Sequence, residues 1–264
     1  MKTVRWLRVK YCGFWPFCII SKLTRYPFTV FFPYIIIKYY NYIMEEDIKF
    51  TFTVTYIFLL TTATITFIEA IRTPNARARH ILNLETAISL IAGYFYSLFV
   101  EKITASENTK TPMEWKEISI LRYLDWSMTT PLMLLVLCLV LSGNIHKSLP
   151  LSLLLAIIGL DFAMLYAGYL GETGEINLWT ACSIGFVAFF GMFGLIYKNF
   201  VMPVYNLSNY ILFGAYIVIW TFYGLFYLAD ETHKNIGMNI LDCIAKCFIG
   251  LSLWAYFSKI FVLR

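Results

Sequence analysis

Two short polar runs inside apolar segments carry most of the residues whose types and spacing suggest chemistry. The first is Arg122–Leu132, which reads RYLDWSMTTPL, and the second is Asp242–Lys246, which reads DCIAK. An ionised side chain at membrane depth costs roughly 2.5–3.5 kcal/mol on insertion scales. Two carboxylates, a guanidinium and an amine in such segments therefore predict a buried charge cluster whose members compensate one another.

The spacing of these residues places them on two helix faces. Asp242 and Lys246 are four residues apart and share one face, and Arg122 and Asp125 are three apart and share another. If the two faces meet, the lysine lies among two carboxylates and a guanidinium. Thr129 follows Asp125 by four residues, so its hydroxyl can bond that carboxylate and tune its proton affinity.

The composition indicates a membrane protein. The chain of 264 residues is 59% hydrophobic and 14% charged, which is too apolar for a soluble domain of this length. Windows of about 19 residues predict seven transmembrane helices. We place them at about 48–71, 80–101, 118–141, 149–170, 176–197, 204–229 and 236–261. The expected fold is an all-α, seven-transmembrane-helix bundle over residues 45–264.

Other classes of function have no support in the sequence. We find no nucleotide-binding loop, no zinc spacing and no Ser/His/Asp arrangement, so we expect no enzyme, no metal site and no nucleic-acid partner. Cys243 and Cys247 stand four residues apart, but no His or further Cys nearby completes a ligand set. We expect both thiols to pack as small apolar groups.

The charge of the connections alternates along the chain. The first connection, residues 72–80, is strongly basic, and later basic positions are His146, Lys147, Lys198, Lys259 and Arg264. The alternate connections are acidic or balanced. Because Lys and Arg are enriched in cytoplasmic loops, we expect the C-terminus in the cytoplasm and the N-terminal end of the bundle, residue 45, outside.

The first 44 residues form a separate basic and aromatic extension with three open interpretations. The first interpretation is a targeting segment, because a basic start precedes short apolar runs. The second is an interfacial amphipathic helix on anionic lipid. Alternatively, it lies outside the functional protein, with Met44 as the working start before a polar lead-in. The predicted function does not depend on this choice.

The two opening runs together resemble the microbial rhodopsins. The run Arg-Tyr-x-Asp-Trp-x-x-Thr-Thr-Pro-Leu in the third span and Asp-x-x-x-Lys in the seventh are matched here by residues 122–132 and 242–246, and the resemblance extends over residues 45–264. It implies all-trans retinal bound to Lys246 as a protonated Schiff base. It also implies that Asp125 and Asp242 are counterions, with Arg122 just outside them, in agreement with retinal counterions as a usual meaning of intramembrane charge.

The resemblance also implies which side chains contact the chromophore. In the fourth span the family pattern Asp-x-x-Met-x-x-x-Gly is matched by Asp161, Met164 and Gly168, and Cys182 and Phe186 of the fifth span are expected at the ring end. The full set of implied contacts is Trp126, Thr130, Met133, Met164, Gly168, Trp179, Tyr216 and Trp220. Met133 stands at a position that often sets colour in the family and suggests green absorption.

The sixth span departs from the family pattern in two places. Phe213 stands where the family has Trp, and Ile217 stands where it has a kinking Pro. Because a residue other than Pro restores a backbone hydrogen bond, we expect a straighter sixth helix.

The polar residues favour a light-gated cation channel. Val136 occupies the position eleven residues after Asp125, three helical turns toward the cytoplasm, where an outward proton pump needs an internal donor. Asn235 and Asn239 lie in line with Asp242, as in a hydrated cation path, and Glu69 and Glu85 are expected at an inner constriction. Glu85 has an equally weighted alternative as a carboxylate that reaches toward water. The pattern is similar to the giant-virus rhodopsins of the first group, which act as light-gated cation channels.

Two other functions within the family remain open. One is outward proton pumping, with Glu85 as a displaced donor, and the other is a slow photosensory rhodopsin, because the lack of a donor slows reprotonation. In each case the expected partners are the lipid bilayer and monovalent cations or protons, and we expect a homo-oligomer. A viral gene product of this kind would be an integral, multi-pass protein of the host cell membrane.

Overall fold

The structure is a computed structural model that describes the backbone of residues 28–259 and the side chains of residues 46–259. The chain divides into two units, Met1–Ile43 and Met44–Arg264. Residues 1–27, which carry most of the basic extension, lie outside the described residues. The three interpretations of residues 1–44 therefore stay predictions.

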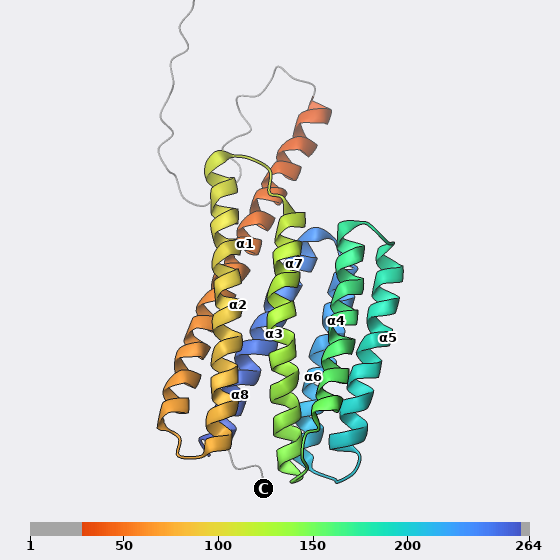
Figure 1. Cartoon of the computed structure of the whole chain (residues 1–264). Helices are drawn as coiled ribbons and strands as arrows, with labels where there is room; N and C mark the ends of the chain where they lie inside the picture. Colours follow the sequence, from red (N-terminus) through yellow and green to blue (C-terminus); the bar gives the residue numbers. More distant parts are fainter. Residues whose placement is uncertain (1–27, 260–264) are drawn as a thin grey trace, which may run out of the picture. The chain divides into compact units, whose positions relative to one another are not determined.

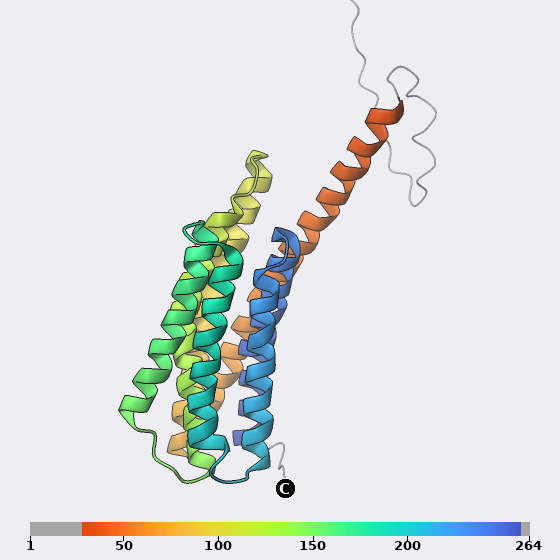
Figure 2. The same ribbon diagram turned by 90° about the vertical axis from the view of Figure 1, so that its right-hand side faces the viewer.

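The described residues form helices throughout, joined by short connections (Figures 1 and 2). The elements are α1 (Phe28–Arg72), α2 (Ala76–Thr109), α3 (Trp115–Asn144), α4 (Leu151–Thr173), α5 (Leu178–Ile196), η2 (Tyr197–Val201), α6 (Leu207–Tyr227), α7 (Glu231–Asp242), η3 (Cys243–Phe248) and α8 (Ile249–Phe257). Here η denotes a π-helix. Helices α7, η3 and α8 follow one another without a break.

Seven of these segments are long and apolar enough to cross a membrane. They are Glu46–Arg72, Ala76–Thr109, Trp115–Asn144, Leu151–Thr173, Leu178–Val201, Leu207–Tyr227 and Glu231–Phe257. The predicted all-α fold with seven spans is confirmed for the described residues. The second span is longer than expected, because α2 continues to Thr109 instead of ending near Glu101.

Local chemistry explains where several helices begin and end. The side chains of Asn75, Asn177, Asn206 and Asp230 accept hydrogen bonds from backbone N–H groups in the first turns of α2, α5, α6 and α7, as preferred N-cap residues do. Helix α4 ends at Gly174, whose φ of +85° places it in the left-handed region that glycine adopts without strain.

Hydrogen bonds from His233 hold the pKa of the Asp230 carboxyl, the N-cap of α7, below its usual range.

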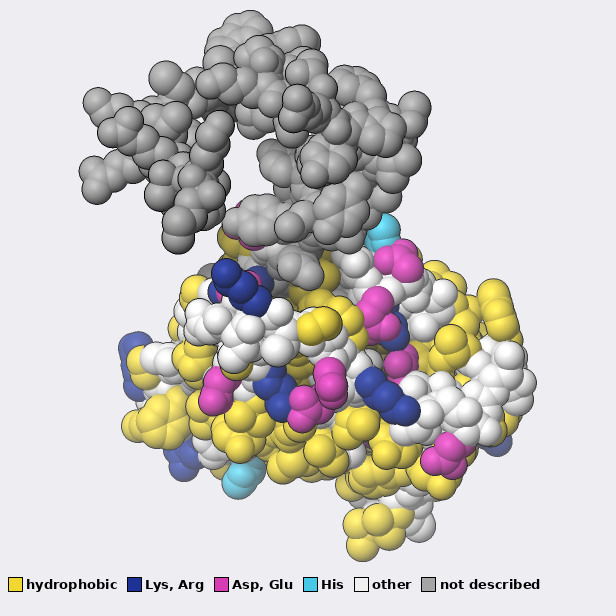
Figure 3. Space-filling model, turned by 90° about the horizontal axis from the view of Figure 1, so that it is seen from above, with side chains coloured by type: hydrophobic (Ala, Val, Ile, Leu, Met, Phe, Trp, Pro, Cys, Tyr) yellow, Lys and Arg dark blue, Asp and Glu magenta, His cyan; other side chains and the backbone are white. Residues whose placement is uncertain are grey.

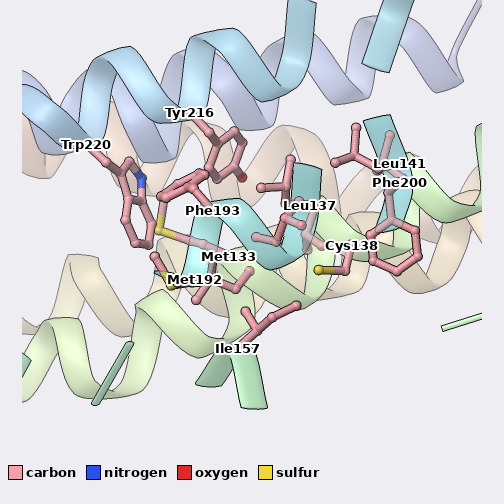
Figure 4. Close-up of a cluster of buried hydrophobic side chains, with 14 of the residues drawn as sticks. Met133, Leu137, Cys138, Leu141, Ile157, Met192, Phe193, Phe200, Tyr216 and Trp220 are labelled. Atoms are coloured by element: carbon pink, nitrogen blue, oxygen red, sulfur yellow. The ribbon is translucent and has the colours of Figure 1, made fainter. Parts of the chain in front are cut away.

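The interior of the bundle contains two main clusters of buried apolar side chains. A large apolar cluster joins α3, α5 and α6, with Met133, Leu137, Phe193 and Trp220 among its side chains (Figure 4). A second, smaller cluster joins α1, α2 and α3 around Phe52 and other aromatic side chains. The charged residues of the opening runs therefore lie among tightly packed apolar layers.

Large apolar side chains also cover much of the outside of the bundle. Leu151, Tyr166 and Val187 of α4 and α5 are 67%, 63% and 75% exposed. In water such a surface would be unfavourable, whereas in a bilayer it contacts lipid tails. The outward faces of these helices therefore support membrane insertion as directly as the span lengths do.

Candidate functional site: a buried amine between two carboxylates

The amine of Lys246 lies between two carboxylates. Lys246 belongs to η3 and is 1% exposed, and Asp125 on α3 and Asp242 on α7 are both fully buried. The Nζ atom donates a hydrogen bond of 2.7 Å to Oδ2 of Asp125 and lies 3.4 Å from Oδ1 of Asp242. The structure thus brings together the lysine and the two acids of the two polar runs.

Asp242 is held by side chains from three other helices. Its Oδ1 accepts hydrogen bonds from the Tyr223 hydroxyl at 2.7 Å and from Nε1 of Trp126 at 3.3 Å. Its Oδ2 accepts a bond of 2.8 Å from the Tyr96 hydroxyl and lies 3.6 Å from the Arg122 guanidinium. The charge of Asp242 is therefore stabilised by several donors besides Lys246.

Asp125 has fewer partners than Asp242. Its Oδ1 accepts one long hydrogen bond of 3.4 Å from the Thr129 hydroxyl, which also donates to the Asp125 backbone carbonyl at 2.9 Å. The bond from Lys246 is its short one. Asp125 is therefore the carboxylate with unused acceptor capacity next to the amine.

Aromatic rings surround the guanidinium of Arg122. Its Cζ lies 5.4 Å from the ring centres of both Phe52 and Phe99, and 6.0 Å from that of Trp126. The cation is attracted to the faces of such rings, and more strongly where water is excluded. Because Arg122 is only 2% exposed, these contacts fix a positive charge inside the bundle.

Two amides hold the same guanidinium. Nη2 of Arg122 donates to Oδ1 of Asn239 at 3.0 Å and to Oδ1 of Asn235 at 3.3 Å. Nδ2 of Asn239 donates to Thr51 of α1 at 2.9 Å, and Nδ2 of Asn235 donates to the backbone carbonyl of Glu231 at 2.8 Å. We expected these amides to line a hydrated path, but here both are buried and occupied by Arg122 and their other partners.

Ion pairs continue from these amides toward the end of the bundle. The Lys234 amine lies 3.1 Å from Glu172 of α4 and 3.2 Å from Glu231, and the side chains of Lys234 and Glu172 are only 9% and 10% exposed. Figure 3, which views this end from above, shows acidic and basic side chains next to one another. Oppositely charged residues therefore close this end of the bundle.

An apolar pocket extends from the Lys246 amine between helices α3 to α6. The predicted contacts that line it are Trp126, Thr130, Met133, Met164, Gly168 and Trp220, together with Lys246 itself. Cys182 and Phe186, expected at the ring end, also line it. A retinal polyene needs a long apolar slot that ends at an amine with acids beside it. This combination of walls and end groups fits retinal.

Two predicted contacts lie elsewhere. Trp179 does not reach the pocket: it is the second residue of α5, its side chain is 69% exposed, and Ala181 and Cys182 of the next turn face inward instead. A Trp near a helix end commonly lies at the membrane interface. Tyr216 is buried but stands behind the pocket lining, with its ring centre 6.2 Å from that of Trp220 (Figure 4).

Polar contacts position the middle of the pocket. The Thr130 hydroxyl donates to Oδ2 of Asp161 at 2.7 Å and joins α3 to α4 beside the lining. A Cβ atom at Gly168 would run into the hydroxyl of Tyr123, so only a glycine lets that ring lie against α4. Met164 lines the pocket between these two positions.

A separate group of polar side chains lies between α1, α2 and α8. Glu85 is 2% exposed, and its Oε1 has no hydrogen-bond partner among the described residues; the same holds for the hydroxyls of Thr62 and Ser89. A Cβ atom on Gly250 would meet Glu85 Oε2 at 2.9 Å. Buried polar atoms without partners are sites where ordered water fits. Glu69, near the C-terminal end of α1, is only half-buried.

The sequence did not single out the two tyrosines that bind Asp242. Tyr96 on α2 is fully buried, whereas Tyr94, two residues earlier on the same helix, is 61% exposed. Tyr223 lies one turn after Trp220 on α6, on the face that Trp220 shares. That spacing is the signal that would have identified it.

Comparison with known proteins places this geometry in a family. The family model of the bacteriorhodopsin-like proteins matches residues 46–260. Among solved structures, the viral rhodopsin OLPVRII is 42% identical, with a TM-score of 0.75, over 81% of this chain and 99% of that chain. The proton-pumping rhodopsin AR2 from the marine alga Acetabularia acetabulum shares the fold, with 21% identity, a TM-score of 0.63, and coverage of 81% and 96%.

Curated relatives match over a shorter stretch. The green-light absorbing proteorhodopsin of Gamma-proteobacterium EBAC31A08 is 27% identical over 52% of this chain and 60% of its own length. The chain thus covers less than two thirds of that relative. Taken with the seven spans, the lysine in its apolar pocket and the family match, these findings show that the chain is an integral, multi-pass membrane protein of the bacteriorhodopsin-like family, the light-driven microbial rhodopsins, which bind retinal as a Schiff base on a lysine.

Proposed function

We propose that this chain is a light-gated cation channel. The observation that carries the proposal is the series of polar side chains that runs from Asp242 through Arg122, Asn239 and Asn235 to the Glu231 carboxylate at the end of the bundle. On the other side of the amine, Val136 is aliphatic and fully buried where a pump of this family needs an internal donor. The chain is also similar to a viral rhodopsin, whose name does not distinguish a channel from a pump.

Retinal on Lys246 supplies the response to light, because its polyene isomerises when it absorbs a photon. The protein provides the proton acceptor. Oδ2 of Asp125 lies 2.7 Å from Nζ of Lys246, within direct transfer distance. Asp242 already accepts hydrogen bonds from Tyr96, Tyr223 and Trp126. The amine proton therefore goes to Asp125, while Asp242 keeps its charge.

Transfer of the proton from Lys246 to Asp125 neutralises both groups and thereby changes the electrostatic forces on Arg122. In the dark the amine and guanidinium balance two carboxylates, so the four formal charges sum to zero. Once the proton of Lys246 reaches Asp125, the charge of Asp242 is no longer shared with the amine, and Arg122 is the cation that balances it. A shift of the guanidinium toward Asp242 would release Asn239 and Asn235, whose amide oxygens can then coordinate water and a cation. The path is closed in the dark because these amides bind Arg122.

Glu85 provides the inner part of the proposed path. Its carboxyl and the hydroxyls of Thr62 and Ser89 form a buried polar site near Gly250. Hydration of this site would connect the amine to the half-buried Glu69 at the end of α1. The same observation favours a second candidate, outward proton pumping with Glu85 as a displaced donor, because a buried carboxyl with an unpaired oxygen is suited to hold a proton.

The proposed orientation puts the C-terminus in the cytoplasm and residue 45 outside. It rests on the basic residues of the connections at the end of the bundle near the C-terminus and on the mixed charges of the other end. With this orientation Asn235 and Asn239 lie in the outer half of the path. Monovalent cations or protons are the proposed cargo, and a homo-oligomer is the proposed assembly.

Voltage-clamp recording under light tests the proposal. In a cell that expresses the chain and is supplied with retinal, a channel gives photocurrents that reverse sign at a potential set by the cation gradient. A pump gives outward current at every potential. Lys246→Ala is the control, because it removes the attachment point and should abolish both pigment and current. Photocurrents that never reverse would exclude the channel and favour the pump.

A further inference from the structure

The side chain of Asn209, on the first turn of α6, forms hydrogen bonds to two other helices and not to its own. Its side chain is completely buried. Nδ2 donates to the backbone carbonyls of Leu141 on α3 and Phe200 on η2, each at 3.0 Å. Oδ1 accepts a bond of 2.9 Å from Nδ2 of Asn144, at the end of α3. Both donor hydrogens and the acceptor are therefore used.

The two carbonyls that Asn209 binds are the ones a helix leaves without partners. The last four C=O groups of an α-helix have no N–H within the helix to accept from. Leu141 lies in the last turn of α3, which ends at Asn144, and Phe200 lies next to the end of η2. A buried carbonyl without a partner is costly. Asn209 thus replaces the missing N–H groups at the ends of two neighbouring helices.

The neighbouring contacts show that these helix ends are held from several sides. Arg77 of α2 donates to the Leu139 and Val140 carbonyls of α3, each at 3.0 Å. Lys147 donates to the Asn199 carbonyl of η2 at 2.9 Å. Asn209 differs from these residues because it belongs to α6 and is fully buried. It is the described side chain of α6 that joins this helix to the ends of both α3 and η2 by hydrogen bonds.

We propose that Asn209 is a positioning residue that holds the first turn of α6 against the ends of α3 and η2 in the dark. Light then opens this end of the bundle by breaking the three side-chain bonds, and their re-formation drives the return to the dark state. The proposal rests on the light-driven activity of the family and not on the choice between channel and pump. Absence of channel currents would leave it intact.

Two measurements on retinal-loaded protein in lipid nanodiscs test the proposal. Hydrogen exchange followed by mass spectrometry reports whether the amides of residues 203–213 exchange faster in light than in the dark. Flash absorption spectroscopy gives the half-time of the return to the dark state. The variants are Asn209→Leu, which keeps the volume and loses all three bonds, and Asn144→Ala, which loses one. Asn206→Ala is the matched control, because it removes a backbone cap in the same turn.

We expect light to speed exchange in residues 203–213 of the unmodified chain, and Asn209→Leu to show that fast exchange already in the dark. Asn144→Ala should lengthen the return half-time about fivefold, the effect of one hydrogen bond, and Asn209→Leu should lengthen it further. Asn144→Ala should add nothing in the Asn209→Leu background. Asn206→Ala should change the half-time less than twofold.

Three outcomes would overturn the proposal. The first is a return half-time of Asn209→Leu within twofold of the unmodified chain. The second is an equal effect of Asn206→Ala, which would indicate helix stability as the cause. The third is exchange in residues 203–213 that does not respond to light. If Asn209→Leu forms no pigment, the comparison of Asn144→Ala with Asn206→Ala decides by the same criteria.

Discussion

At the scale of single residues, the two carboxylates beside Lys246 differ in the number of donors that reach them. Asp242 accepts hydrogen bonds from Tyr96, Tyr223 and Trp126. Asp125 accepts one short bond, from Lys246, and one long bond, from Thr129. Two acids of the same type are therefore suited to the different tasks proposed for them, because more donors stabilise the charged form of Asp242 than that of Asp125.

The first prediction concerns the colour of the pigment. Asp125→Asn removes the negative charge 2.7 Å from Nζ of Lys246, so the absorption band should shift to longer wavelength. Glu69→Gln, far along α1, is the control and should leave the band in place. Absorption spectra of the two purified variants with retinal test this directly. An unshifted band for Asp125→Asn would remove Asp125 from the counterion role.

The second prediction concerns the amide that holds Arg122. Asn239→Leu removes the shorter of the two amide bonds of the buried Arg122 Nη2, which leaves that group with only the 3.3 Å bond to Asn235 and costs about 1–3 kcal/mol. The variant should lose pigment at lower temperature and conduct less under light, while its absorption band stays in place. Asn83→Leu on the exposed start of α2 is the matched control. Unchanged conductance would show that Asn239 does not belong to the ion path.

At the scale of the helices, hydropathy was sufficient to predict all seven spans, because each crosses a bilayer with few charges. The extension of α2 to Thr109 was missed since its last turns are polar and lie beyond the apolar window. The π-helices η2 and η3 were also missed, because hydrophobic periodicity does not register one extra residue in a turn. The contact of Trp179 with the chromophore was implied by the family resemblance alone, and the structure instead places its side chain on the exposed face of α5.

The third prediction concerns helix α6, which is uninterrupted from Leu207 to Tyr227 with Ile217 at its middle. Ile217→Pro removes a backbone hydrogen bond and introduces a clash with the preceding turn, at a cost of about 3 kcal/mol or more. Thermal loss of pigment in detergent measures it, with Ile217→Ala as the control for lost side-chain volume. Equal melting temperatures for the two variants would mean that α6 tolerates a kink here.

At the scale of the whole molecule, the family resemblance rested on two motifs, residues 122–132 on α3 and residues 242–246 on α7 and η3. They lie far apart in sequence, and the resemblance assigns residues of both to the same chromophore. The apolar pocket follows from the same two runs, since Trp126 and Lys246 lie on its wall. The partners of Arg122 did not follow, because Phe52 and Phe99 are ordinary apolar residues of their helices until the fold brings them together. Long-range contacts of this kind have no signature in local spacing.

The fourth prediction concerns the orientation in the membrane. Ser148 and Glu175 are exposed and lie in connections at opposite ends of the bundle. In intact cells a membrane-impermeant thiol reagent should modify Glu175→Cys and not Ser148→Cys, with the parent chain as the background. Permeabilised cells should show both modifications. The reverse pattern in intact cells would invert the proposed orientation.

The π-helix around Lys246 has a consequence for how the pigment tolerates changes in chain length. Successive residues of a helix point roughly a quarter of a turn apart, so removal of Ala245 alone would swing the amine away from Asp125 and Asp242. Hydropathy, composition and span length would hardly change, and the product should still insert and fold as helices. It should nevertheless be colourless, because attachment of the chromophore depends on the angular phase of one turn as much as on the presence of a lysine.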